Sequence, residues 1–107
     1  MMISNTPPPP YYAVIFSSVK TNDNEGYAET DALMSELAHQ QDGFLGMENA
    51  SSEIGISISY WRDVETIKRW KDDLDHQKAQ REGQKTWYSQ YKVRIAKVER
   101  DYDFLKK

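Results

Sequence analysis

Alternation of apolar and polar residues marks the clearest strand of this chain. Every second residue from Ile54 to Tyr60 is apolar, and the residues between them are glycine or serine. A period of two is typical of a β-strand whose two faces have different surroundings. The pattern predicts a strand over residues 54–61, reached from the preceding strand through a turn at residues 51–53.

A helical pattern follows this strand directly. Asp63 stands where an N-cap is expected, and Glu65 would lie in the first helical turn, where a negative charge is favourable. Gly83 is expected to close or bend the helix. Apolar residues at spacings of three and four then fall on one side of it: Val64, Ile67, Trp70 and Leu74.

Three earlier segments also have recognisable patterns. Residues 11–19 form a nearly continuous run of strand-forming apolar residues, which predicts a strand buried on both faces. Residues 26–41 repeat apolar positions at helical spacing, and Asp42-Gly43 is expected to end that helix. Residues 44–50 are predicted to form the second strand.

The last predicted strand, residues 91–99, changes phase along its length. Its apolar positions shift from Val93 and Ile95 to Ala96 and Val98. Either a bulge or a strand that serves two surfaces would explain this shift.

The predicted order of elements is β-α-β-β-α-β, which is the ferredoxin-like arrangement, an α+β fold. Right-handed crossovers place both helices on one face of a four-stranded antiparallel sheet. The first and third strands are nevertheless apolar on both sides, so the other face needs a cover. We expect a second copy of the chain to provide it, and therefore a homodimer.

Composition fits one soluble domain. The chain has 107 residues, enough for a single core, and no apolar run approaches the roughly 18 residues of a membrane span. The N-terminus lacks the basic-then-apolar order of a secretory signal. The absence of cysteine excludes disulfides and thiolate sites, and it is compatible with a reducing cytoplasm. A net charge of −3 gives no reason to expect a nucleic-acid partner.

Charge is unevenly distributed along the chain. Residues 1–60 carry one lysine and eight carboxylates, whereas residues 61–107 carry thirteen basic and nine acidic side chains. The simpler interpretation is that two parts of one fold compensate each other, and the alternative is a basic patch for an anionic ligand or an acidic partner. Residues 1–10 end in four prolines and are predicted to be a flexible arm before a single domain at 11–104, with an SH3-type ligand tract as the alternative.

Four stretches, which together cover residues 26–104, resemble the antibiotic biosynthesis monooxygenase superfamily of dimeric α+β barrels. They are GYAETDALMSELAHQQDGFLGMENA, GISISYWRDVETIKRWK, HQKAQREG and TWYSQYKVRIAKVERDYDF. The resemblance is closest to small bacterial members. It implies a homodimer with a small-molecule pocket inside each protomer, between the helices and the sheet. The superfamily includes cofactor-independent and haem-degrading monooxygenases, isomerases and decarboxylases.

The haem-degrading relatives combine a tryptophan on the second helix with a later histidine and a first-strand asparagine. Trp70 matches the tryptophan, but Gln80 stands ten residues later where the histidine would be. The first strand offers Ser17 and Ser18 in place of asparagine. The set of residues that the resemblance requires for haem is therefore incomplete, so we expect no cofactor, and a haem-degrading monooxygenase is the less favoured alternative.

His76 is the candidate catalytic residue. It is interpreted either as a surface or interface histidine, or as a group that hydrogen-bonds a ligand or carries a proton, for which its ordinary pKa of about 6.5 is suitable. Its only fellow histidine is His39 on the other predicted helix, so we expect no metal site.

The resemblance implies a monooxygenase-like enzyme that oxidises a small aromatic or polycyclic molecule without a cofactor. Trp70 is interpreted as core packing or as a pocket wall, and His76 or Gln80 as the polar contact. Trp87 and Tyr91, with Tyr88 beside them, would line a pocket mouth or seal a dimer interface. Tyr60 is the remaining candidate for contact with substrate. The alternative is a non-catalytic small-molecule-binding or stress-associated protein that uses the same pocket.

Overall fold

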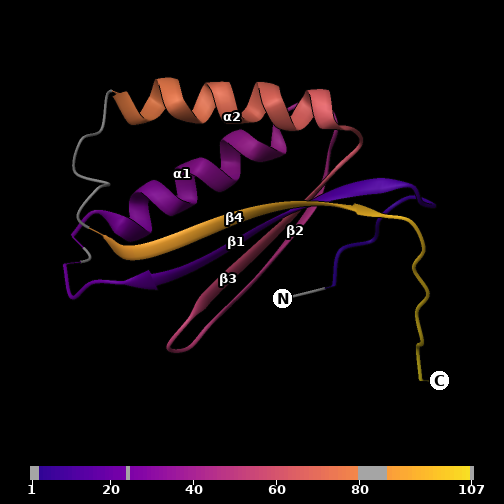
Figure 1. Cartoon of the computed structure of the whole chain (residues 1–107), viewed down its shortest axis with the longest axis horizontal. Helices are drawn as coiled ribbons and strands as arrows, with labels where there is room; N and C mark the ends of the chain where they lie inside the picture. The colour runs from indigo at the N-terminus through magenta and orange to yellow at the C-terminus, as the bar shows by residue number, and fades with distance from the viewer. Residues whose placement is uncertain (1–2, 24, 80–86, 107) are drawn as a thin grey trace.

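A four-stranded antiparallel sheet with two helices on one side forms the body of the molecule (Figure 1). The computed structural model describes residues 3–23, 25–79 and 87–106, with side chains described up to Leu74 and again from Trp87. The strands are hydrogen-bonded in the order β2-β3-β1-β4. In chain order the elements are β1 (Tyr11–Lys20), α1 (Tyr27–His39), β2 (Phe44–Ser51), β3 (Gly55–Trp61), α2 (Val64–Ala79) and β4 (Tyr88–Val98). The predicted ferredoxin-like α+β fold is confirmed.

The predicted start of α2 is also confirmed. The backbone N–H of Thr66 donates to Asp63 Oδ1 at 2.8 Å, so Asp63 is the N-cap. This hydrogen bond holds the pKa of the Asp63 carboxyl below its ordinary value. Gly43 lies in the connection between α1 and β2, directly before β2. Its φ of 86° is a left-handed conformation that favours glycine.

The predicted bulge near Ile95 and Ala96 is wrong. The pairing of β1 with β4 runs without interruption from Tyr11 opposite Val98 to Val19 opposite Gln90, and the register shifts only beyond Val19. The change of phase instead reflects a strand with apolar residues on both faces. Ile95 and its neighbours two residues away lie on one side of the sheet, while Ala96 lies on the other.

The core lies between the helices and the sheet. Trp61 is fully buried, and its ring stacks on that of Trp70 with 6.0 Å between centroids. Its indole N–H donates to Ser59 Oγ at 2.9 Å, so its polar atom is satisfied inside the core. Ala38 of α1 and Ile67 of α2 complete the buried cluster. Partly buried side chains pack around it: Tyr12, Val14, Leu37, Phe44, Met47 and Leu74.

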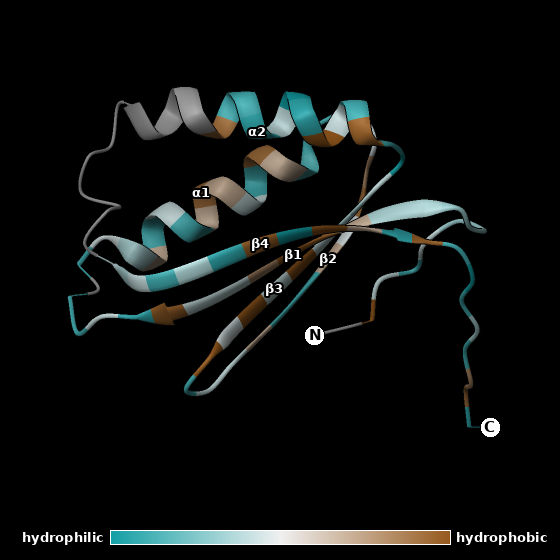
Figure 2. Ribbon diagram, viewed as in Figure 1, coloured by the Kyte–Doolittle hydropathy of each residue, from teal (hydrophilic) through white to brown (hydrophobic). Residues whose placement is uncertain are grey.

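The two faces of the sheet follow from this core. Tyr12 and Val14 pack under the helices, so alternate residues of β1 and the residues paired with them form the helix face. The opposite side, called here the open face, carries Ala13, Ile15 and Ser17 of β1, Ile56, Ile58 and Tyr60 of β3, Glu48 and Ala50 of β2, and Lys92, Arg94 and Ala96 of β4. Neither helix covers it (Figure 1). The prediction that the strand is apolar on both sides holds for β1, whereas on the helix face of β3 only Trp61 is apolar and the other residues are glycine and serine. Figure 2 shows apolar segments along these two central strands.

The described part of the N-terminal arm lies against the sheet. The Ser4 backbone N–H donates to Glu48 Oε2 at 2.8 Å, and Thr6 Oγ1 donates to the Tyr11 hydroxyl at 3.0 Å. Gly46 allows this approach, because a Cβ there would lie 2.6 Å from Ser4 Oγ. The arm is therefore held at two points, and its flexibility stays a prediction.

Candidate functional site

The helix face of β4 carries a row of exposed apolar side chains. Tyr91, Val93 and Ile95 lie opposite residues of β1 that face the helices, yet they are 54%, 47% and 55% exposed. The buried core described above contains residues of both helices and of β1, β2 and β3, and none of β4. These three residues, called the β4 row, form an apolar surface beside the helix layer that the described residues leave uncovered.

An aromatic cluster closes one end of the β4 row. Tyr91 stacks on Phe16 with 5.4 Å between ring centroids, and Tyr88 meets Phe16 edge-on at 5.4 Å. Tyr27, at the start of α1, meets Trp87 edge-on at 5.3 Å and Tyr88 at 6.1 Å. Edge-on and offset ring pairs of this kind stabilise a cluster beyond the burial of area alone. These rings together form an aromatic wall at this end of the β4 row.

Trp87 is fixed in that wall by its indole N–H. The group donates to the carbonyl oxygen of Glu25 at 2.9 Å, and the side chain is only 8% exposed. Trp87 therefore ties the loop before α1 to the start of β4, and it supports the ring of Tyr27 that leans against it.

The polar groups at this end are hydroxyls and one lysine. The Tyr88 hydroxyl donates to the Tyr27 hydroxyl at 3.4 Å, and burial raises the pKa of Tyr88 above its ordinary value. Tyr88 therefore remains a protonated O–H at neutral pH. Lys20 Nζ lies 4.2 Å from the centre of the Tyr27 ring, a cation–π contact. An apolar row with a cation and phenol groups at one end suits a flat aromatic molecule with an oxygen substituent.

Trp70 lies at the other end of the helix face. It is 9% exposed and packs on Trp61, which is paired with Tyr12 of β1. Tyr91 is paired with Ser18, six residues further along the same strand, which corresponds to about 20 Å. Trp70 and Tyr91 therefore cannot contact opposite sides of one small ring system.

Tyr60 lies on the open face, on the opposite side of the sheet from Trp70. Its hydroxyl donates to Glu48 Oε1 at 2.8 Å, and burial together with this carboxylate raises the pKa of Tyr60 to about 12. This position separates Tyr60 from the other candidate substrate contacts, because alternate residues of a strand point to opposite faces. His76 and Gln80 lie outside the residues whose side chains the structure describes.

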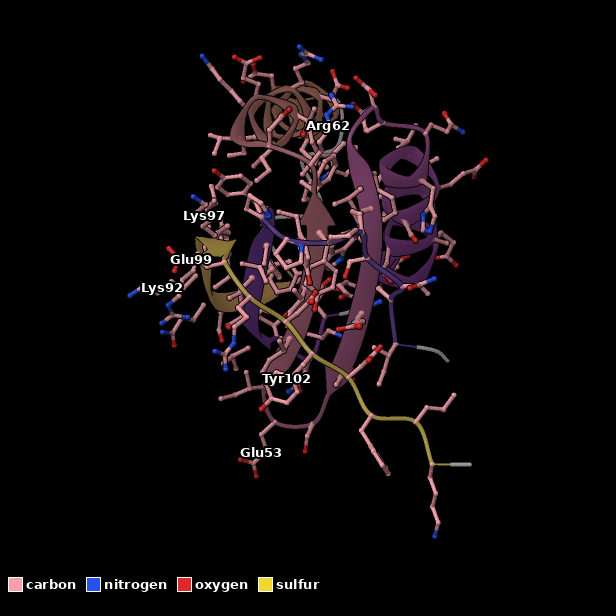
Figure 3. The ribbon with its side chains drawn as sticks, turned by 90° about the vertical axis from the view of Figure 1, so that its right-hand side faces the viewer. Glu53, Arg62, Lys92, Lys97, Glu99 and Tyr102 are labelled. Carbon is pink, nitrogen blue, oxygen red and sulfur yellow. The ribbon has the colours of Figure 1, made fainter. Side chains whose placement is uncertain are left out.

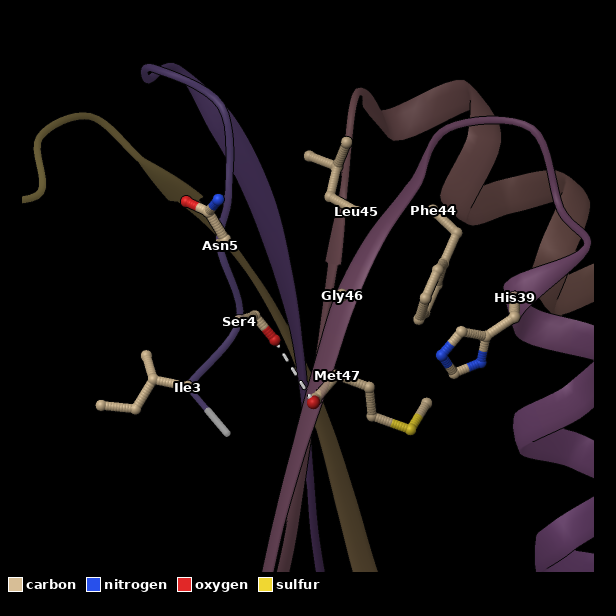
Figure 4. A pocket seen from close by; sticks show the side chains of 8 residues that line it. All are labelled: Ile3, Ser4, Asn5, His39, Phe44, Leu45, Gly46 and Met47. Carbon is tan, nitrogen blue, oxygen red and sulfur yellow. Dashed lines mark hydrogen bonds between the residues drawn. The ribbon is translucent and has the colours of Figure 1, made fainter. Parts of the chain in front are cut away.

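A shallow hollow of about 440 Å³ lies at the outer edge of β2 (Figure 4). His39 and Phe44 form one side of it and the arm residues Ile3 and Asn5 the other. His39 is exposed, and its Nδ1 lies 2.7 Å from the carbonyl oxygen of Ser35. No sequence pattern pointed to this hollow, because the docking of the arm creates it. Among the described side chains, no three His, Cys, Asp or Glu residues are grouped as a metal site would require.

Sequence reasoning placed Trp87, Tyr88 and Tyr91 together, and the structure adds Phe16 and Tyr27 to them. The signal for Phe16 was the apolar run of the first strand, but its partner on β4 depends on the strand register. None of the helices in the described residues is both long enough and apolar enough to cross a membrane.

Comparison with known proteins places the chain in a family. Residues 20–97 match the monooxygenase af470-like family. The uncharacterized protein YqjZ of Bacillus subtilis strain 168 is 48% identical over 100 residues, which cover 92% of this chain and 88% of that protein.

Solved structures share the fold at low sequence identity. SnoaB, a cofactor-independent oxygenase from Streptomyces nogalater, is 13% identical, with a TM-score of 0.66 over 87% of this chain and 97% of that one. A Nitrosomonas europaea protein assigned to the antibiotic biosynthesis monooxygenases is 16% identical, with a TM-score of 0.66 over 88% and 94% of the two chains. The chain therefore belongs to the monooxygenase af470-like family, and it shares its fold with the solved structures named above.

Proposed function

We propose that the protein is a cofactor-independent oxygenase that oxidises a small aromatic or polycyclic molecule bound along the β4 row. The observation that carries this proposal is the exposure of Tyr91, Val93 and Ile95 on the helix face, next to a wall of aromatic rings. Family membership supports the reaction class. An apolar surface with few polar groups is what binding of a flat aromatic molecule requires.

The proposed chemistry needs an electron-rich substrate. Removal of a proton from a phenolic or benzylic position gives an anion that transfers electrons to dioxygen itself. Oxidation of a ring CH₂ to a carbonyl consumes one O₂ and releases one water, so no reductant is needed. The β4 row would exclude water from the anion, and the protonated Tyr88 hydroxyl and Lys20 would stabilise its oxygen.

The candidate residues take the following roles in this proposal. Tyr91 contacts the substrate ring directly, and Trp87 supports the aromatic wall. His76 is the candidate proton acceptor, and His76 or Gln80 supplies the polar contact, as expected from the sequence. Trp70 has a packing role in this proposal and does not contact the substrate, because it stacks on Trp61 at the far end of the helix face.

Oxygen consumption with a panel of hydroxylated naphthalenes and anthrones tests this proposal. Under ¹⁸O₂, one labelled oxygen atom should appear in the product by mass spectrometry. Val93→Asp should lower kcat/KM at least about tenfold, because it places a charge on the apolar surface. Val64→Asp is the matched control, since Val64 is 51% exposed at the start of α2 and should leave turnover unchanged. Equal loss in both variants would contradict a site along the β4 row.

A non-catalytic binding protein is the second candidate function. The observation that favours it is chemical: the polar groups described at this end of the β4 row are phenol hydroxyls and one lysine, which act as hydrogen-bond donors. Such a surface binds an aromatic anion without supplying a base. Saturable binding of the panel, measured by tyrosine and tryptophan fluorescence with no oxygen uptake, would support this alternative.

The proposal includes assembly as a homodimer in the cytoplasm. The open face supports the dimer, because it presents Ile56 at 42% exposure together with Ile15 and Ile58 on a side that neither α1 nor α2 covers. Native mass spectrometry of the purified protein counts the subunits, and a monomer at micromolar concentration would contradict this part. Fractionation of the host cells tests the compartment.

A further inference from the structure

The hollow at the outer edge of β2 is separate from the β4 row. Its volume of about 440 Å³ lies within the range of small-molecule pockets. β2 and β4 are the two edge strands of the sheet, so about 14 Å, three strand spacings, separates them. The hollow is therefore available to a ligand that does not occupy the proposed substrate site.

A bulge in β2 brings two apolar side chains to this hollow from the same face of the sheet. Phe44 pairs with Trp61, and Gly46 already pairs with the preceding residue of β3. Leu45 is therefore an extra residue, as in a β-bulge. Without it, Phe44 and Met47 are three residues apart and would point to opposite faces. With it, both lie on the helix face, pack against the core and line the hollow.

His39 completes this side of the hollow, and its tautomer is fixed. The centroids of the His39 and Phe44 rings lie 4.6 Å apart, and Figure 4 shows both rings beside Met47. Nδ1 of His39 lies 2.7 Å from the Ser35 carbonyl oxygen, which can only accept, so Nδ1 carries the hydrogen. In the neutral ring Nε2 is then an acceptor, and no residue in the described part of the chain donates to it.

The N-terminal arm forms the opposite wall of the hollow. Ser4 Oγ donates to the Met47 carbonyl oxygen at 3.3 Å, and the Ser4 backbone N–H donates to Glu48 Oε2 at 2.8 Å. These two bonds hold Ile3 and Asn5 beside the edge of β2, where both line the hollow (Figure 4). The arm therefore adds an apolar side chain, that of Ile3, from outside the sheet.

The chemistry of the lining favours an uncharged ligand. Among the described residues that line the hollow there is no Asp, Glu, Lys or Arg. Charged side chains lie elsewhere: Figure 3 shows Lys92, Lys97 and Glu99 on or beside β4, at the other edge of the sheet. An ion in the hollow would lose hydration without gaining an opposite charge.

We propose that this hollow is a further binding site, which takes a small uncharged aromatic molecule with one N–H or O–H donor. The donor binds Nε2 of His39, and the ring lies against Phe44 and Met47, whose sulfur makes favourable contacts with aromatic rings. Ile3 of the arm covers the other side of the ligand. This inference is independent of the proposed oxygenase activity, because it uses no residue of the β4 row or of the aromatic wall.

Titration of the ¹⁵N-labelled full chain with indole, followed by amide NMR, tests the site. Indole should shift the amide signals of Leu45, Gly46 and Met47 along a saturable curve. 1-Methylindole has the same ring without the N–H donor, so its Kd should be at least about fivefold higher. Indole shifts confined to the β4 row, or no saturable shifts at all, would overturn the site.

Two variants separate the hydrogen bond from the arm wall. His39→Phe keeps a ring beside Phe44 but removes the acceptor, so it should abolish the preference for indole over 1-methylindole. Ile3→Ser should raise the Kd of both probes about threefold, because it removes apolar contact area from the arm. Ile54→Ser is the matched control, since Ile54 is 54% exposed in the turn before β3 and outside the hollow. A preference for indole that persists in His39→Phe, or equal effects of the two isoleucine variants, would contradict the proposal.

Discussion

Trp61 and Trp70 stack with 6.0 Å between their rings, and this pair joins α2 to the end of β3. Trp61 is fully buried and Trp70 is 9% exposed, so both rings lie in the core of the helix layer. The pair fixes where α2 crosses the sheet. The buried cluster built around this pair includes residues of β1, β2 and β3 and none of the β4 row.

Trp70→Ala should therefore destabilise the fold rather than remove a substrate contact. Truncation of a buried tryptophan typically costs about 3–5 kcal/mol, and Trp70→Phe should cost less because an aromatic ring remains on Trp61. Urea unfolding followed by far-UV circular dichroism measures both losses. If Trp70→Ala left the free energy of unfolding unchanged, the packing role would be wrong.

Gly43→Ala should be more harmful than Gly26→Ala. Both glycines have positive φ, 86° and 77°, and a Cβ at Gly43 would lie 2.5 Å from the Thr66 side chain. A Cβ at Gly26 meets nothing closer than 3.7 Å, so that variant bears only the backbone cost of about 1 kcal/mol. The difference in unfolding free energy between the two variants isolates the clash. Equal losses would show that Thr66 moves aside without cost.

Most of the fold could be predicted because its signals are local. The period-two run before Trp61 and the helical spacing after Asp63 each lie within one element, and both were confirmed. The site depends on register between distant strands, which no single stretch encodes. The position of Val93 and Ile95 on the helix face, which makes them part of the candidate site, follows only from the pairing of β4 with β1.

Tyr60 shows how the period of a strand separates candidate residues that are close in sequence. Its neighbour Trp61 points into the core, so the alternation of the strand itself places Tyr60 on the other face. Tyr60 is aromatic and close in sequence to Trp70, but these two properties do not place the two side chains on the same face of the sheet. The period of two along β3 therefore predicts the face on which Tyr60 lies. Its hydrogen-bond partner, Glu48 of β2, can be identified only from the register of the β2–β3 hairpin.

Acid should weaken the fold partly through Asp63. Its pKa is lowered from an ordinary value of 3.8, chiefly by the hydrogen bond from the Thr66 N–H. A depressed folded-state pKa stabilises the fold above pH 3.8, and this stabilisation is lost as pH falls through the folded-state pKa. Asp63→Asn keeps a capping side chain but removes the titration, so its Tm should fall less steeply below pH 4. Asp72→Asn, an exposed change on α2, serves as the control.

Tyr60 gives the matching prediction at alkaline pH. Its pKa is raised to about 12 by burial and by the nearby Glu48 carboxylate, above the ordinary value of 10.0. A raised folded-state pKa means that the stabilisation is complete below pH 10 and declines as pH rises toward 12. Tyr60→Phe should cost about 1 kcal/mol at neutral pH through the lost hydrogen bond to Glu48, and the variant should lose less stability above pH 10.

Tyr102→Phe is the control for that measurement, because Tyr102 is 88% exposed in the tail. The same Tyr60 variant should also loosen the arm, since Glu48 holds both the Tyr60 hydroxyl and the Ser4 backbone N–H. Hydrogen exchange at Ser4 measures this directly. Faster exchange in Tyr60→Phe than in Tyr102→Phe would support a Glu48 carboxylate that positions the arm, and equal exchange would show that Ser4 is held independently of Tyr60.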